Sequence, residues 1–151
     1  MTQIFYLEGD HLWAETFKPQ LDRYGLIRVI STEYDFRKAI DELVETNAQF
    51  PTITILEQTV RWTNASPNMP TRPPKIREEG PQNAGIRCYD YLRIAQSDSQ
   101  RTPVIFYSHT RPMQIVKLMK SKGVKDNNQD YQCVEKKEIL DELHQAIRRV
   151  L

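Results

Sequence analysis

Short apolar runs alternate along the chain with longer segments in which apolar residues recur every three or four positions. The short runs indicate buried strands, and the longer segments indicate amphipathic helices. Strands are expected at residues 4–7, 26–30, 51–58, 103–108 and 130–134. Helices are expected at residues 10–24, 32–44, 84–95, 112–122 and 138–151. Five strand–helix units in succession predict an α/β fold with a parallel sheet, helices on both faces and right-handed crossovers.

Capping and breaking residues set the expected helix ends. Asp10 and Thr32 each stand just before a helical pattern and can accept a hydrogen bond from its first turn. Pro19 lacks an amide donor, so the first helix is expected to kink or restart late there. Gly25 and Gly123 are expected to end the first and fourth helices. The positions expected to face the core are Trp13, Phe17, Leu21, Tyr24, Phe36, Ala39, Ile40, Leu43, Val44, Ile86, Tyr89, Leu92, Ile115, Val116, Leu118, Met119, Leu140, Leu143, Ile147 and Val150. The pattern as a whole describes a doubly wound, five-stranded, flavodoxin-like α/β domain.

Composition indicates one domain, residues 1–151, because a chain of this length can bury roughly 70% of its unfolded surface. The 21 basic and 20 acidic residues leave a net charge of +1, which provides no field for nucleic acid or a membrane surface. No apolar run is long enough to cross a bilayer, and the N-terminus lacks a signal-peptide pattern. We therefore expect a cytoplasmic protein with no membrane or nucleic-acid partner. Cys88 and Cys133 lie far apart and are expected to be buried, reduced thiols.

Acidic residues follow two of the expected strands directly. Glu8 and Asp10 come after the apolar run at 4–7, and Glu57 follows the apolar and β-branched run that precedes it. Ligands of open α/β sheets gather beyond the carboxyl ends of the strands, so these residues stand where a site would be. If the two strands are parallel neighbours, the three carboxylates converge at one edge of the sheet and form an acidic pocket.

Residues 60–83 are expected to form a loop inserted between the third strand and the third helix. The segment contains five prolines, few aliphatic residues and several arginines. Loops of this length in compact domains are usually functional or disordered. One interpretation is a partner-binding arm that uses extended proline-rich recognition or phosphate contacts; the other is a solvated, mobile loop. The candidate contact residues are Arg61, Trp62, Arg72, Lys75 and Arg77.

The order of these elements and motifs resembles the receiver domain of bacterial response regulators over nearly the whole chain. The run at 4–10 is similar to the family's first strand with its acidic pair. Glu57 stands where the family's third strand ends in the phosphorylated aspartate. Ser108 ends the fourth expected strand, as does the family's Thr or Ser that follows the phosphoryl group. Tyr131 is similar to the aromatic rotamer switch of the family's fifth strand.

The chain departs from the family at the phosphorylation site itself. Gly9 stands at one position of the acidic pair, and Glu57 replaces the nucleophilic aspartate. The resemblance implies Mg²⁺ held by the acidic pair; with one ligand missing we expect no cofactor, and Glu8 and Glu57 are the remaining metal candidates. The extra methylene of glutamate moves the attacking oxygen by about a bond length, which can cost roughly a hundredfold in rate. We therefore expect no efficient phosphotransfer.

The family's pocket lysine has two candidate positions in this chain. Val134 stands three residues after Tyr131, where the family has the lysine, and Lys136 lies two residues further on. Because strand side chains alternate with a period of two, Lys136 is expected on the same side as Val134. The sequence leaves open whether Lys136 reaches Glu57.

The resemblance and the departures together predict a divergent pseudo-receiver. This would be a non-catalytic signalling module of a response-regulator-like, two-component phosphorelay system, and it would act on another signalling protein through protein–protein interaction. Glu57 would mimic the phosphorylated form by contacting Ser108 or Lys136. Helices 112–122 and 138–151 would form the output face and could form a homodimer interface. The alternatives are a receiver that is still phosphorylated, on Glu57 or nearby, and a small nucleoside- or NAD-processing α/β enzyme that uses Glu57.

Overall fold

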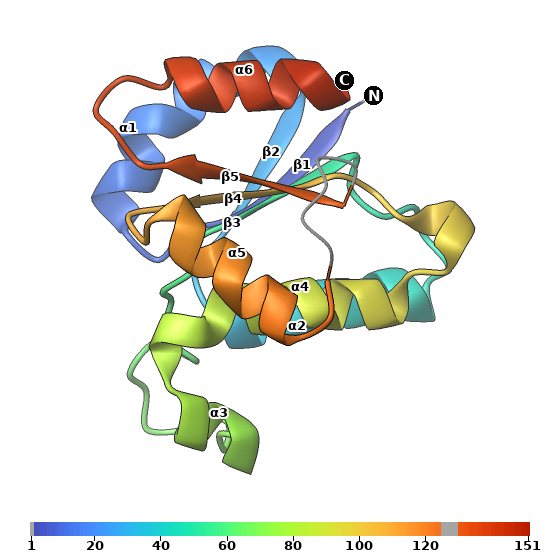
Figure 1. Cartoon of the computed structure of the whole chain (residues 1–151). Helices are drawn as coiled ribbons and strands as arrows, with labels where there is room; N and C mark the ends of the chain where they lie inside the picture. Colours follow the sequence, from blue (N-terminus) through green and yellow to red (C-terminus); the bar gives the residue numbers. More distant parts are fainter. Residues whose placement is uncertain (1, 125–129) are drawn as a thin grey trace.

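A five-stranded parallel sheet forms the centre of the molecule (Figure 1). The computed structural model describes residues 2–124 and 130–151. The strands follow the spatial order β2-β1-β3-β4-β5, and every neighbouring pair is parallel. Their bounds are β1 Gln3–Leu7, β2 Leu26–Ile30, β3 Ile53–Leu56, β4 Val104–Ser108 and β5 Tyr131–Glu135. The expected flavodoxin-like α/β fold is confirmed.

Helices cover both faces of this sheet. The α-helices are α1 His11–Leu21, α2 Glu33–Glu45, α3 Pro74–Glu79, α4 Ala84–Ala95, α5 Pro112–Ser121 and α6 Asp141–Val150. Short 3₁₀ turns are η1 Asp22–Tyr24, η2 Pro81–Asn83 and η3 Asp98–Gln100. In Figure 1, α1 and α6 lie on one face of the sheet, α2, α4 and α5 lie on the other, and α3 stands apart. Within the described residues, no helix has the length and apolar character needed to cross a bilayer.

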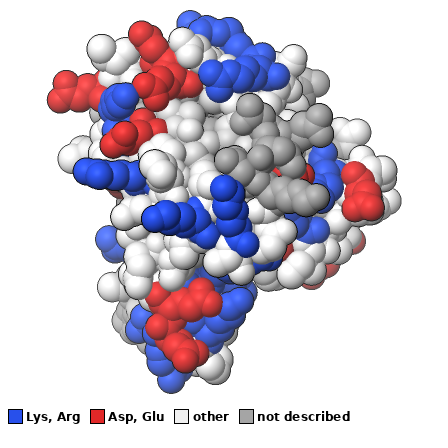
Figure 2. Space-filling view, viewed as in Figure 1, with Lys and Arg blue, Asp and Glu red and all other residues white. Residues whose placement is uncertain are grey.

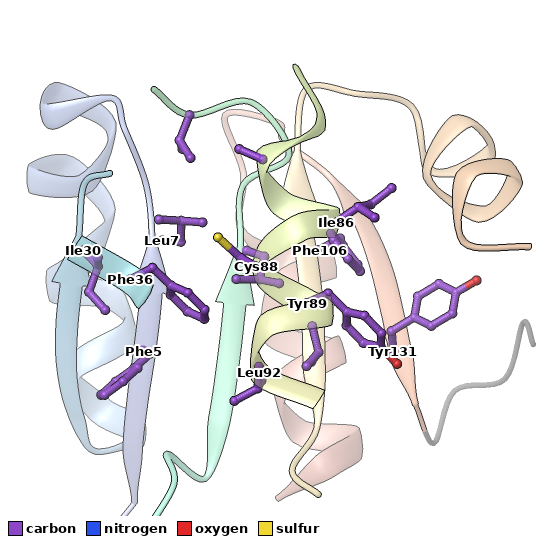
Figure 3. Packing of buried hydrophobic residues seen from close by; sticks show 14 of the residues in the cluster. Phe5, Leu7, Ile30, Phe36, Ile86, Cys88, Tyr89, Leu92, Phe106 and Tyr131 are labelled. Atoms are coloured by element: carbon purple, nitrogen blue, oxygen red, sulfur yellow. The ribbon is translucent and has the colours of Figure 1, made fainter. Parts of the chain in front are cut away.

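Alternation along the strands gives each face of the sheet its own core. Ile4 and Tyr6 of β1 pack toward α1 and α6, whereas Phe5 and Leu7 pack toward α2 and α4. Figure 3 shows the second core, in which Phe36 of α2 and several residues of α4 cover the sheet. Because both faces are covered, the central strands are almost wholly apolar up to their carboxyl ends. Apart from Thr54 of β3, the polar residues of the central strands stand at the strand ends.

Both expected helix caps are present, but the expected interruption of α1 is not. Asp10 accepts a hydrogen bond from the Trp13 amide at 3.1 Å, and Thr32 accepts one from the Asp35 amide at 3.2 Å. The expectation of a late restart at Pro19 is wrong, since α1 includes Pro19 and η1 follows directly. Pro19 is exposed, so its ring and the missing amide hydrogen bond lie on the solvent side of the helix.

Most helix positions expected to face inward are buried or half-buried, and Val44 is the clearest exception. Val44 is 54% exposed, whereas Phe36, Ala39 and Ile40 are fully buried. Leu43 packs against the edge of the core. The inward stripe of α2 is therefore one position narrower than expected, because residues 36, 39, 40 and 43 already fill the face that meets the sheet.

The insertion between β3 and α4 is a loop over residues 60–73, as expected, but it is anchored to the domain by packed residues, which was not expected. Helix α3 forms within it, and Val60, Trp62 and Ile76 are buried. The Trp62 indole, only 9% exposed, donates a hydrogen bond to the Pro70 carbonyl at 3.2 Å. Its ring also makes an edge contact with Tyr34 of α2. The few apolar residues of the segment are thus enough to fix it on the domain, and Trp62 is an anchor rather than an exposed contact residue.

Candidate functional site

The carboxyl ends of four strands meet at a small polar cavity of about 190 Å³. Parallel register places Leu7 beside Leu56 and Ser108 beside Glu135, so the residues that follow these strands emerge at the same edge. The lining consists of Glu8, Asp10, Glu57, Thr59, Ser108, His109, Thr110 and Lys136. The structure thus brings together the three acidic residues, the serine and the second of the two lysine candidates that the sequence suggested.

Lys136 lies between two carboxylates. Its ammonium group forms ion pairs with Glu8 and with Glu57, and Nζ lies 2.5 Å from Oε2 of Glu57. The lysine side chain is 2% exposed. The ring centroids of Trp13 and Tyr107 lie 5.0 and 5.8 Å from the same nitrogen. Charge pairing and cation–π attraction therefore hold this ammonium group in a fixed place.

Both carboxylate oxygens of Glu57 have partners. Oε1 accepts hydrogen bonds from the backbone amides of Gln58 at 2.7 Å and Thr59 at 3.2 Å. The Ser108 hydroxyl also donates to Oε1, and Oε2 faces Lys136. Hydrogen bonds to an ionised acceptor are among the stronger ones in proteins. The Glu57 carboxylate is therefore fixed just beyond the end of β3.

Glu8 completes the buried charge cluster. Its Oε1 accepts from the Asp10 amide at 3.0 Å, and the Tyr6 hydroxyl donates to Oε2 at 3.2 Å. Burial raises the pKa of Glu8 above its ordinary value, although the ammonium of Lys136 opposes that shift. Burial and the neighbouring Glu8 also raise the pKa of Tyr6, so this hydroxyl remains a neutral donor. Two carboxylates share one ammonium group, and the excess negative charge is costly in this buried place.

The residues present do not fit the Mg²⁺ ion that the receiver resemblance implies. A hard divalent cation needs several oxygen ligands, usually carboxylates together with waters. The Lys136 ammonium lies between Glu8 and Glu57, the two candidate ligands, and Asp10 is engaged as the cap of α1. Over residues 2–124 and 130–151, no group of three or more His, Cys, Asp or Glu side chains is placed to hold a metal ion.

Tyr131 lies at the far end of β5 from the cavity. It pairs with Val104 at the start of β4, whereas the Lys136 amide donates to the Ser108 carbonyl at 2.8 Å beyond the other end of β5. The Tyr131 ring makes an edge contact with Phe106 inside the core (Figure 3). The structure therefore does not bring the expected switch residue into contact with Ser108.

Lys136, rather than Val134, points into the cavity. Val134 packs in the core beneath α1 and α6. In the family pattern the lysine follows the aromatic switch by three residues, and the same count back from Lys136 reaches Cys133 instead of Tyr131. In this register the aromatic position of the family holds a small thiol side chain. Lys136 lies two residues beyond the position that the family pattern predicts from Tyr131. Tyr131 was therefore assigned to the aromatic position although it does not stand three residues before the lysine.

Sequence reasoning missed the two aromatic rings that pack beside Lys136. Trp13 and Tyr107 were expected only as parts of a helix and a strand, and their ring centroids lie 6.3 Å apart. Both rings also face the ammonium group of Lys136. Trp13 stands three residues after the cap Asp10, in the first turn of α1, which begins at the carboxyl end of β1. This position could have indicated that its ring lies near the residues that follow the strands.

A second buried ion pair, which no motif indicated, lies beside the insertion. The Arg87 guanidinium donates two hydrogen bonds to Glu33, at 2.7 and 2.9 Å, and the two side chains are 2% and 0% exposed. Arg87 also lies 3.4 Å from Glu79 of α3, and Arg37 lies 3.3 Å from Glu33. This network joins α2, α3 and α4. Its central pair, Glu33 and Arg87, is 54 residues apart in the sequence, so no local spacing could reveal it.

Gly85 allows α4 to start directly against the end of β3. Its amide donates to the Gln58 carbonyl at 3.0 Å, and a Cβ at this position would lie 2.7 Å from both the Gln58 Cα and the Glu57 carbonyl oxygen. Gly85→Ala is therefore expected to displace α4 and to destabilise the fold by about 1–3 kcal/mol, measured by urea unfolding. Gly9→Ala is the control, because its Cβ would lie 3.4 Å from the nearest atom, in Val60. Equal stabilities of the two variants would contradict the close-approach argument.

The basic residues of the insertion remain on the surface and outside the cavity. Arg61, Arg72, Lys75 and Arg77 are exposed. Lys75 lies 3.8 Å from Glu79, one turn further along α3. Figure 2 shows basic and acidic side chains mixed over α3. The segment therefore presents a charged surface whose support is the buried Trp62 and Ile76.

The arrangement of strands and helices is that of the receiver fold, and solved structures agree. The chain is similar to the response regulator TrrA from Thermotoga maritima, solved in complex with Mg²⁺ and BeF, with 14% identity, a TM-score of 0.62 and 100% coverage of both chains. It is similar to the receiver domain of a putative LuxO repressor protein from Vibrio parahaemolyticus, with 16% identity, a TM-score of 0.60 and coverage of 98% of this chain and 88% of that one.

A third similar structure is the N-terminal domain of a three-domain response regulator/sensory box/GGDEF protein from Carboxydothermus hydrogenoformans. Here the identity is 15%, the TM-score is 0.60, and the match covers 99% of this chain and 93% of that one. No protein-family model and no curated protein sequence matches the chain. At these identities the comparisons establish the receiver fold.

Proposed function

We propose that this protein is a pseudo-receiver, a signalling module that acts through protein–protein interaction and neither accepts a phosphoryl group nor catalyses a reaction. One observation carries the proposal. The Glu57 carboxylate already has the partners that the receiver resemblance gives to a phosphoryl group, namely the Ser108 hydroxyl and the Lys136 ammonium. An acceptor whose oxygens are fully engaged with the protein itself is a poor nucleophile.

The buried charges also oppose metal binding. Mg²⁺ would have to separate Lys136 from Glu8 and Glu57, and breaking a buried ion pair is strongly unfavourable. Without the metal, the site has no divalent cation to neutralise an incoming phosphoryl group. This supports a module whose site is occupied by its own side chains.

The same contacts support one fixed signalling state. The Ser108 hydroxyl donates to Glu57 and accepts from the Thr110 amide at 3.1 Å. The segment after β4 is thereby linked to the end of β3, as the family's Thr or Ser is linked to the phosphoryl group. Glu57 would then take the place of the phosphorylated aspartate.

We assign the output surface to α5 and α6, with the exposed arginines of the insertion as a second contact area. Helix α5 exposes Lys117 and Lys120 and has no acidic residue, whereas Asp141 and Glu142 begin α6. Figure 2 shows basic side chains over α5 and acidic ones near the start of α6. Opposite charges on α5 and α6 can pair between two copies of the chain across a two-fold axis, which suits a homodimer.

The deciding measurement is a titration with Mg²⁺ followed by BeF₃⁻, monitored by amide NMR and Trp13 fluorescence. Because the Trp13 ring centroid lies 5.0 Å from the Lys136 nitrogen, movement of the ammonium group would change the indole emission. We expect no saturable shift at Glu8, Glu57 or Ser108 at millimolar Mg²⁺. TrrA, which was solved with both ligands, provides the positive control for the assay.

Saturable shifts centred on Glu8, Glu57 and Ser108 would contradict the proposal and favour a receiver that is still phosphorylated. The double variant Gly9→Asp, Glu57→Asp supplies the two carboxylates that the family pattern contains. A Cβ at Gly9 meets only ordinary contacts, so the aspartate can be accommodated. A response in this variant but not in the unchanged chain would assign the loss of binding to these two positions.

A further inference from the structure

A cavity of about 810 Å³ opens at the opposite end of the sheet from the proposed signalling site. It lies between the amino ends of β1 and β2 and the segment that follows α2. Its apolar walls include Phe5, Leu43 and Phe50, and among the described residues that line it Arg28 is the only charged one. The volume is in the range of small-molecule sites. The pseudo-receiver proposal assigns no role to this cavity.

Arg28 is placed to receive an anion. Its guanidinium carbon lies 5.4 Å from the centroid of the Phe5 ring, so the planar group is supported by an aromatic face. Among the described residues, none of the ion pairs involves Arg28. A stacked guanidinium still presents its N–H donors at its edge, in the geometry that matches a carboxylate. Arg28 therefore offers a charge and a donor pair at the mouth of the cavity.

The apolar part of the wall, formed by Phe5, Leu43 and Phe50 beside the polar Gln3, Gln49 and Thr52, is continuous with the core. Leu43 and Phe50 are partly buried and pack against the cluster that contains Phe5. Leu26, at the rim, remains 58% exposed. An alkyl chain placed here would remove apolar surface of both partners from water.

We propose that this cavity binds an amphipathic carboxylate of the fatty-acid class. The carboxylate pairs with the Arg28 guanidinium, and the alkyl chain lies along Phe5, Leu43 and Phe50. The inference does not depend on the pseudo-receiver function, because the two sites lie at opposite ends of the strands. The proposal gives the protein a small-molecule ligand at a site separate from the cavity in which Lys136 pairs with Glu8 and Glu57.

The test is a titration of the whole chain with hexanoate, octanoate and decanoate, each below its micellar concentration, followed by amide NMR. We expect saturable shifts centred on Phe5, Leu43 and Phe50, with an affinity that rises about fourfold per methylene. Arg28→Gln should weaken decanoate binding by roughly tenfold, because a hydrogen-bonded charge pair is lost. Arg61→Gln, which removes an exposed arginine of the insertion, should leave the affinity unchanged.

Three results would overturn the proposal. One is the absence of saturable shifts with decanoate. Another is equal affinity for decanol and decanoate, which would mean that Arg28 does not recognise the carboxylate. The third is equal weakening by Arg28→Gln and Arg61→Gln, which would point to general attraction of anions to the surface. Binding of a leucine-rich peptide with no binding of decanoate would replace the fatty acid by a protein partner.

Discussion

Lys136→Met is expected to lower the free energy of unfolding by about 3–5 kcal/mol at neutral pH. The substitution keeps a long side chain but leaves the carboxylates of Glu8 and Glu57 buried together without their cation. Like charges at short range in a poorly solvated place repel strongly, so one of the two must take up a proton or the site must open. Urea unfolding followed by tryptophan fluorescence gives the magnitude.

The loss of unfolding free energy in Lys136→Met should become smaller as the pH falls. The pKa of Glu8 is raised above its ordinary value of 4.5. Its contribution to stability is therefore complete below pH 4.5 and is lost as the pH rises through the higher folded-state pKa. Lys136 lowers that pKa, so its removal raises the folded-state value further and widens this window. A deficit of the same size at about pH 5 and pH 7 would contradict the charge argument.

Glu8→Gln is the matched control for the lysine variant. It leaves Lys136 and Glu57 as a one-to-one pair and keeps an acceptor for the Tyr6 hydroxyl. The variant removes one of the two buried negative charges that share a single ammonium group. We therefore expect its stability at neutral pH to equal or exceed that of the unchanged chain. If Glu8→Gln cost as much as Lys136→Met, the loss would come from breaking the contacts of the cluster in general and not from an unpaired buried charge.

Arg87→Met is expected to cost about 3 kcal/mol, the second largest effect. The change leaves Glu33 fully buried, with Arg37 as its remaining ion-pair partner among the described residues. Arg37 is 23% exposed and lies 3.3 Å away, so it compensates in part. The variant also loses the contact with Glu79, and the insertion should loosen, with a red shift of Trp62 emission. Urea unfolding and emission spectra measure the two effects.

Arg77→Met is the matched control for Arg87→Met. Arg77 is an exposed arginine of α3, and within the described part of the chain its side chain makes one hydrogen bond, to the Arg72 carbonyl at 3.4 Å. Surface changes of this kind usually alter stability by less than about 0.5 kcal/mol. If both variants lose stability equally, the destabilisation comes from α3 as a whole rather than from the buried charge of Glu33.

The sequence was informative about the fold because the periodic segments are long and their flanking residues are specific. Asp10 and Thr32 cap the helices that they were expected to cap, and Gly123, with a φ of 81°, follows the end of α5. The convergence of Glu8 and Glu57 followed from parallel neighbouring strands, which the structure contains. Local rules of capping and alternation were enough for these features.

What the sequence could not indicate depends on contacts between distant segments. Glu33 and Arg87 pair across two helices, and nothing near either residue marks the partner. The burial of Trp62 depends on Tyr34 of α2, so a tryptophan in a proline-rich segment was interpreted as a contact residue. The point at which β5 ends decides whether position 134 or position 136 faces Glu57. The hydrophobic pattern alone places a strand end only to within a residue or two.

The ion pairs of Lys136 also bear on the order in which the chain can assemble. Two acidic residues lie at the ends of the central strands β1 and β3, but their cation arrives only after β5, the last strand to leave the ribosome. A nascent chain that lacks β5 has no lysine between these carboxylates, so the carboxyl edge of its sheet must stay hydrated. Closure of that edge therefore waits for the final strand, and a chain truncated before Lys136 should remain open there even if β1, β2 and β3 have paired.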